Sequence, residues 1–142
     1  MNEALFSSKS VEWSTPQDFF DALDAEFHFT LDPCADDENH KCDLYFTKEQ
    51  DGLKQDWGGH TVFCNPPYCR QTGKWVQKAV EECKKPGTTV VLLIPARPDV
   101  SYFHDYLYKK TNVELRFVRG RLKFGGSKQS APFPPLVAVI RG

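Results

Sequence analysis

Residues 88–94 read TTVVLLI, a continuous apolar run that is rich in β-branched side chains. Such a run is typical of a strand that is covered on both faces, since a strand with one face in water alternates apolar and polar residues. Strands of this kind occur in α/β proteins, where helices pack on both faces of a mostly parallel sheet. The run therefore predicts the central strand of such a sheet.

Helices and strands alternate on both sides of this run. Apolar spacing and the positions of Gly and Pro place the other elements along the chain. They are a helix over about 16–26, strands over 28–31 and 61–64, helices over about 75–83 and 99–110, and strands over 113–118 and 136–140. The polar, acidic residues between 34 and 60 predict a long loop. This alternation indicates an α/β fold with a mostly parallel sheet and helices on both faces.

The first helix has a sequence signal at its start. Thr15 is predicted to be its N-cap, because a threonine hydroxyl can accept from the amides of the first turn. Pro16 is predicted to be the first helical residue, where its missing N–H has no cost.

Length and charge limit the class of protein. A chain of 142 residues predicts one domain over 1–142, in which the polar residues 1–12 are loosely ordered. The net charge of −1 gives no overall attraction to nucleic acid, so a site for a polyanion must be a local basic patch. The sequence has no apolar run of about 18 residues and no signal-peptide pattern. We therefore expect a soluble, cytoplasmic protein with no membrane contact.

The five cysteines predict neither a disulfide framework nor a metal site. Their number is odd and they form no CxxC pair, so reduced thiols in a cytosolic protein are the simpler interpretation. Cys34, His40 and Cys42 lie close together in the sequence, but their spacing matches no common zinc template. We predict that the chain holds no metal.

Residues 65–68 read NPPY and follow the predicted strand over 61–64. Two consecutive prolines make a stiff segment that keeps its carbonyl groups but donates no backbone hydrogen bonds. Asn65 offers a side-chain oxygen, Pro66 a carbonyl oxygen, and Tyr68 an aromatic face. In open α/β sheets ligands bind beyond the carboxyl ends of the strands, which is where this loop is predicted.

This set of groups suits a planar substrate that carries an NH₂ group. Two acceptors can bind the two amine hydrogens while the substrate ring stacks on Tyr68. A conjugated amine is a poor nucleophile, and acceptors that pull on its hydrogens orient its lone pair toward a methyl donor. A base in duplex DNA would first have to flip out of the stack. The loop therefore indicates direct methylation of such an amine.

The chain resembles a known family, the phage-type DNA N-6-adenine methyltransferases, which use S-adenosylmethionine. The resemblance covers residues 13–121, and the NPPY loop is its most specific part. The other stretches occur in the order typical of the family: WSTP (13–16), LDPCA (31–35), YFT (45–47), DGL (51–53) with DW (56–57), LLIPA (92–96) and RGRLKF (119–124).

This resemblance implies a fold, an activity and a cellular setting. The implied fold is a compact, Rossmann-like, S-adenosylmethionine-dependent methyltransferase fold in which some strands of the full sheet are missing. The implied activity is methylation of adenine in double-stranded DNA, in the cytoplasm of a bacterial host. The resemblance makes Asn65, Pro66, Pro67 and Tyr68 the catalytic loop.

The resemblance also implies the residues that bind the cofactor. Asp32 would meet the methionyl ammonium, and Asp56 would accept from the adenine amine of the cofactor. The remaining cofactor-binding residues implied in this way are Trp13, Thr15, Pro16, Pro33 and Cys34. One departure concerns the loop after the first strand, which in most methyltransferases is rich in glycine. Here residues 32–38, DPCADDE, contain no glycine.

Basic residues near the loop are predicted to bind DNA phosphates. Arg70 follows the NPPY loop directly. The cluster of Arg119, Arg121 and Lys123, with Arg116 nearby, supplies a local basic stripe in a chain of nearly zero net charge.

Two other functions remain open at this point. A methyltransferase of the same fold could act on RNA or on a protein glutamine, because both carry a suitable amine. A non-catalytic protein that binds DNA or another partner, with a degenerate cofactor pocket, is a different class, and the glycine-free loop is the feature that favours it.

Overall fold

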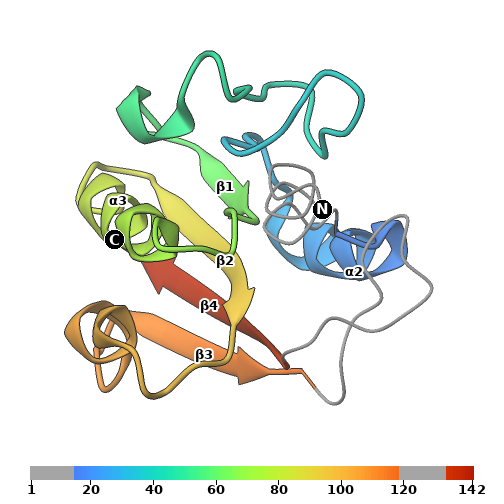
Figure 1. Cartoon of the computed structure of the whole chain (residues 1–142). Coiled ribbons are helices and arrows are strands. Elements are labelled where there is room, and N and C mark those ends of the chain that lie inside the picture. The colour runs from blue at the N-terminus through green and yellow to red at the C-terminus, as the bar shows by residue number, and fades with distance from the viewer. Residues whose placement is uncertain (1–14, 119–133) are drawn as a thin grey trace, which may run out of the picture.

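A central sheet organises the part of the chain that the computed structural model describes, residues 15–118 and 134–142. The strand order in this part is β1-β2-β4-β3. The strands are β1 (Thr61–Cys64), β2 (Thr89–Pro95), β3 (Val113–Phe117) and β4 (Pro135–Arg141) (Figure 1). The predicted bounds of all four strands are confirmed to within a residue. The run 88–94 forms β2, whose residues Val90 to Ile94 are fully buried.

Strand direction differs in part from the prediction. β1 pairs parallel with β2, but β4 pairs antiparallel with both β2 and β3. Three strands therefore point the same way and the fourth runs against them, so the described sheet is mixed and not mostly parallel. The reason is that β3 and β4 are consecutive in the chain, and antiparallel neighbours need no crossover helix. The apolar run over 136–140 carries no signal of strand direction.

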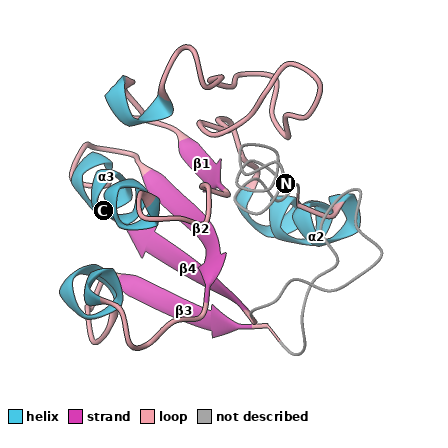
Figure 2. Ribbon diagram, in the orientation of Figure 1, coloured by secondary structure: helices cyan, strands magenta, loops and turns pink. Residues whose placement is uncertain are grey.

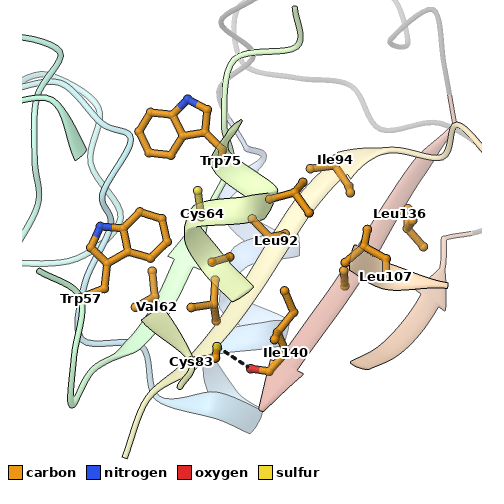
Figure 3. Close-up of a cluster of buried hydrophobic side chains, with 14 of the residues drawn as sticks. Trp57, Val62, Cys64, Trp75, Cys83, Leu92, Ile94, Leu107, Leu136 and Ile140 are labelled. Atoms are coloured by element: carbon orange, nitrogen blue, oxygen red, sulfur yellow. Dashed lines mark hydrogen bonds between the residues drawn. The ribbon is translucent and has the colours of Figure 1, made fainter. Parts of the chain in front are cut away.

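Helices cover both faces of the sheet, as the apolar run predicted (Figure 2). Alternate residues of β2 face opposite sides. Leu92 and Ile94 pack with the helix α3 (Thr72–Glu82) and the short η2 (Phe103–Leu107), while Val91 and Leu93 pack with the helix α2 (Gln17–Phe27). Figure 3 shows the first of these clusters, in which the Cys83 thiol donates to the carbonyl of Ile140 at 3.2 Å.

The start of α2 differs from the prediction. Pro16, and not Thr15, is the N-cap of the helix, and no side chain caps it. The Thr15 hydroxyl instead accepts a hydrogen bond from the side chain of Asn65. A long-range partner has thus replaced the local capping interaction that the sequence pattern favours.

The predicted strand over 28–31 is reduced to two isolated bridges, Leu31 with Val62 and Asp32 with Tyr45. His28 ends α2 in the left-handed conformation, and the Asp24 carboxylate accepts from the amide of Phe29, so little extended chain remains before Pro33. The segment still lies beside β1, because Thr30 donates to the Thr61 carbonyl at 2.8 Å and Phe63 donates to the Leu31 carbonyl at 3.0 Å.

The predicted helix over 99–110 is shorter than expected. Its central turn is η2, a single wide turn that is closed by a hydrogen bond of 2.7 Å from the amide of Tyr108 to the carbonyl of Phe103. Lys109 then adopts a left-handed conformation that interrupts the helix. Phe103 and Leu107 of this turn are buried. The predicted long loop between 34 and 60 contains the short helical turn η1 (Gly52–Lys54).

No helix within residues 15–118 and 134–142 is long and apolar enough to span a membrane.

Candidate active site

The NPPY loop leaves the sheet at the carboxyl end of β1. Asn65 follows Cys64, the last residue of that strand, and Asp32 follows Leu31, which bridges in parallel to Val62. Because these two segments run in the same direction, Asn65 and Asp32 emerge at the same edge of the sheet. This is the edge at which α/β sheets bind their ligands.

Side-chain hydrogen bonds fix the NPPY loop on the scaffold. The Thr72 hydroxyl donates to the Pro67 carbonyl at 2.7 Å and accepts from the amide of Cys69 at 2.9 Å. The Tyr68 hydroxyl donates to the carbonyl of Leu93 in β2 at 2.9 Å. Thr72 is buried at the first residue of α3, so a single side chain joins the loop to the helix that follows it. Thr72 was not predicted from the sequence, although a hydroxyl side chain at the start of a helix is a recognisable signal.

The Tyr68 ring lies partly inside the molecule. It packs against the cluster of Phe63, Val91 and Leu93 that α2 covers. Burial raises the pKa of its hydroxyl well above the ordinary value, and the nearby Cys64, Tyr102 and Cys34 groups add to the shift. The ring therefore has a fixed position beside the loop and keeps its proton at neutral pH.

Asn65 is held by a residue from a distant part of the sequence. Its amide nitrogen Nδ2 donates to Oγ1 of Thr15 at 2.9 Å, and Thr15 is only 5% exposed. An asparagine amide has one donor end and one acceptor end. The bond to Thr15 therefore fixes the orientation of the amide and with it the position of Oδ1. Among the described residues no donor binds the carbonyl of Pro66, whereas that of Pro67 is engaged by Thr72. That Oδ1 of Asn65 and the carbonyl oxygen of Pro66 accept from a substrate amine stays a prediction from the sequence.

Asp32 is a buried carboxylate, with only 4% of the residue exposed. Oδ2 accepts from the amide of Lys41 at 2.9 Å and Oδ1 accepts from the amide of Cys34 at 3.4 Å. Burial raises its pKa to about 6, and the two backbone hydrogen bonds oppose that shift. A carboxylate in this setting favours a cationic ligand, because a positive charge offsets the cost of burying the negative one.

A glycine from another part of the chain, Gly52, packs closely against the loop after Asp32. A Cβ added to Gly52 would overlap the carbonyl oxygen of Pro33 and would lie 3.0 Å from the Trp75 ring. The Gly52 carbonyl accepts from the indole of Trp57 at 2.9 Å, and that fully buried indole stacks on Trp75 with centroids 6.2 Å apart. The DGL and DW stretches therefore support the loop after Asp32, a role that was not predicted from the sequence.

Comparison with known proteins identifies the family of the chain. A family model described as DNA N-6-adenine-methyltransferase (Dam) matches residues 4–134. The chain belongs to this Dam family.

Two phage proteins are similar to the chain in sequence. Proteins named DNA N-6-adenine-methyltransferase from Escherichia phage T1 and from Haemophilus phage HP1 (strain HP1c1) are each 32% identical to this chain over 93 residues, 64% of its length. The matched region is 38% of the T1 protein and 53% of the HP1 protein, so the chain spans about half the length of these relatives or less.

One predicted cofactor residue, Asp56, is not brought to the NPPY loop. Asp56 is exposed and pairs with Lys85 at 2.8 Å, and this ion pair lowers the pKa of its carboxyl. It precedes the amino end of β1, whereas Asn65 follows the carboxyl end, so the structure does not bring Asp56 together with Asn65 and Asp32. Trp13 lies outside the described residues. Pro16, Pro33 and Cys34 lie next to Thr15 and Asp32 along the chain.

Of the predicted DNA contacts, the structure describes Arg70 and the neighbouring Arg116. Arg70 is exposed directly after the loop. Arg119, Arg121 and Lys123 lie outside the described residues. Arg116, which was expected to extend their cluster, donates to Glu26 at 2.6 Å and to Glu114 at 2.7 Å, and these carboxylates raise its pKa. Its charge is therefore balanced within the protein.

The described residues of this Dam chain contain no group of His, Cys, Asp or Glu that could hold a metal ion. His40 and Cys42 do interact, but through a hydrogen bond of 2.8 Å between Nδ1 of the ring and the Cys42 carbonyl. The His40 ring stacks on Tyr45 at a centroid distance of 3.9 Å.

Proposed function

We propose that this chain transfers a methyl group from S-adenosylmethionine to the exocyclic amine of adenine in double-stranded DNA. The observation that carries the proposal is that the NPPY loop, held by hydrogen bonds, and the buried carboxylate of Asp32 emerge at the same edge of the sheet. Family membership and the names of the phage relatives support the same activity.

The residues at the carboxyl edge of the sheet fit the cofactor on chemical grounds. S-adenosylmethionine, when bound, supplies an electrophilic methyl group. The Asp32 carboxylate, buried and oriented by two backbone amides, suits its ammonium group. Pro33 and Cys34 would line the same loop, and Gly52 keeps that loop close to Trp75.

The NPPY loop would prepare the adenine amine. Oδ1 of Asn65 and the carbonyl of Pro66 would each accept one amine hydrogen, and the ring of Tyr68 would stack on the flipped base. These acceptors would stabilise the positive charge that develops on nitrogen as the new N–C bond forms, while the bond between the methyl group and sulfur breaks and its electron pair stays on sulfur. One amine proton then passes to water. Because the prolines and Thr72 fix the loop before the base arrives, little reorganisation accompanies the reaction.

The fold supports this arrangement. The parallel segment Leu31–β1–β2 places both loops at one edge of the sheet, as in Rossmann-like folds. We infer that the described sheet is a reduced form of a Rossmann-like methyltransferase sheet in which β4 runs antiparallel.

The test uses the purified chain, a duplex of unmethylated DNA and cofactor carrying a tritiated methyl group. We expect label in N6-methyladenine, and we expect Asn65→Ala to abolish it while S-adenosylmethionine still binds by calorimetry. RNA and a glutamine-containing protein serve as parallel acceptors. Label in either of them but not in DNA would overturn the DNA assignment. Absence of cofactor binding by the wild-type chain would overturn the enzymatic proposal as a whole.

A further inference from the structure

An open groove of about 440 Å³ begins where the NPPY loop ends. One wall comes from the segment that starts α3 and the other from the segment that leads into η2. Its lining includes Arg70, Lys74, Gln77, Ser101, Tyr102 and Asp105.

The floor of this groove connects with the catalytic loop. Gly73 allows the Tyr102 ring to approach the start of α3, since a Cβ added to Gly73 would lie 3.3 Å from that ring. The Tyr102 hydroxyl is close enough to that of Tyr68 to contribute to its pKa shift. Cys69 and Arg70, the two residues that follow Tyr68, also line the groove, so a molecule lying there would be next to the end of the NPPY loop.

The groove carries two basic side chains beside the end of the NPPY loop. Arg70 and Lys74 are exposed and form no ion pair with any residue in 15–118 or 134–142. Lys48, Lys54, Lys109 and Lys110 are also exposed and unpaired there, so the position of Arg70 and Lys74 in the groove, and not their lack of an ion pair, is what sets them apart. Asp105 is the carboxylate in the lining, so the charged side chains of the groove sum to one positive charge. Gln77, Ser101 and Tyr102 add neutral hydrogen-bonding groups.

We propose that this groove holds the DNA strand that carries the target adenine, at the nucleotides beside the flipped base. The proposal rests on the proposed function. A flipped base stays attached to its strand through its own phosphates, so that strand must pass the mouth of the pocket. Arg70 and Lys74 would neutralise phosphates there, and the Tyr102 ring would contact a neighbouring sugar or base.

Matched charge reversals test the groove. Lys74→Glu and Lys110→Glu change the net charge equally, but Lys110 lies in the turn before β3, near the amino end of β2, away from the loop. We would measure the affinity of each full chain for a short fluorescent duplex by anisotropy between about 50 and 200 mM salt. We expect Lys74→Glu to weaken binding at least tenfold and to reduce the slope of log K against log salt by about 0.9, the value for one lost phosphate contact. Lys110→Glu should remain within about twofold of wild type.

Substitutions that place opposite charges at one exposed position provide a second measurement. Gln77→Lys should tighten DNA binding and Gln77→Glu should weaken it, because both place a charge in the groove without disturbing buried residues. Cofactor affinity should be unchanged in all four variants. Equal DNA binding by Lys74→Glu and Lys110→Glu would overturn the groove assignment, even if the wild-type chain methylates DNA. Dependence on Lys74 that appears with RNA and not with duplex DNA would also overturn it.

Discussion

The side chains of Asn65 and Thr15 are hydrogen-bonded to each other although 50 residues separate them, with Nδ2 of the amide 2.9 Å from Oγ1 of the hydroxyl. This bond ties the start of α2 to the NPPY loop. It also gives Thr15 a structural partner that differs from the cofactor contact implied by family resemblance. The two roles have different kinetic consequences.

Replacing Thr15 with Val keeps its shape and removes the acceptor for Asn65. We expect kcat for methyl transfer to fall about tenfold, which corresponds to the loss of one hydrogen bond that orients a catalytic amide. The KM for S-adenosylmethionine should stay close to wild type. Thr15→Ser retains the hydroxyl and should restore most of kcat. If Thr15→Val instead raises the dissociation constant of the cofactor and leaves kcat unchanged, Thr15 is a cofactor ligand and not a positioning residue.

Thr72 offers a second test of loop fixation. Thr72→Val would remove the donor to the Pro67 carbonyl and leave the Cys69 amide without its acceptor in a buried position. We expect thermal or urea unfolding to show a loss of about 1–3 kcal/mol, the cost of unsatisfied buried groups. Methyl transfer should fall further than the loss of folded protein explains. Thr72→Ser is the matched control, and an equal loss in both variants would indicate that packing of the methyl group matters and the hydrogen bonds do not.

The sequence predicted those parts of the site that depend on local chemistry. The strand over 61–64, the stiff loop at its end and the buried run of β2 each have a pattern within a few residues, and each is confirmed in position. Thr72 and Gly52 were missed, and Thr15 was wrongly predicted to be an N-cap, because their contacts are with residues distant in the sequence. The direction of β4 was missed for a related reason, since an apolar run reports burial on both faces but not which neighbour it pairs with. The strand over 28–31 was predicted too long because the left-handed His28 shortens the extended chain.

Gly52 should matter for cofactor binding even though it lies outside the glycine-free loop. Gly52→Ala would force its new Cβ onto the Pro33 carbonyl and so displace the loop that carries Asp32. We expect a weaker affinity for S-adenosylmethionine by calorimetry, together with a lower melting temperature. Gly59→Ala is the control, because Gly59 has a positive φ of 79° but open space around it. That variant should lose stability, by about 1 kcal/mol, without a change in cofactor affinity. Equal cofactor affinity in the two variants would contradict the supporting role of Gly52.

Asp32 should make both stability and cofactor binding depend on pH. Burial raises its pKa from 3.8 to about 6, so between these values the folded chain holds a proton that the unfolded chain has released. Its contribution to stability is therefore present in full below about pH 4 and is lost as the pH rises to about 6, a change of about 3 kcal/mol at most. Asp32→Asn removes the ionisation, so its stability relative to wild type should increase between pH 4 and pH 7. Urea unfolding across that range measures the difference, and a constant difference would contradict the shifted pKa.

Ionisation of Asp32 lowers the stability of the fold but should raise the affinity for the cofactor. An ammonium ligand favours the ionised form of Asp32, so the affinity for S-adenosylmethionine should rise as the pH passes from about 5 to about 7. Below pH 6 binding should release a proton, which calorimetry in buffers of different ionisation enthalpy detects. Asp32→Asn should bind more weakly at pH 7 and should lose both the pH dependence and the proton release. Wild-type binding that is independent of pH in this range would show that Asp32 does not meet the ammonium, and another residue of the carboxyl edge would have to hold it.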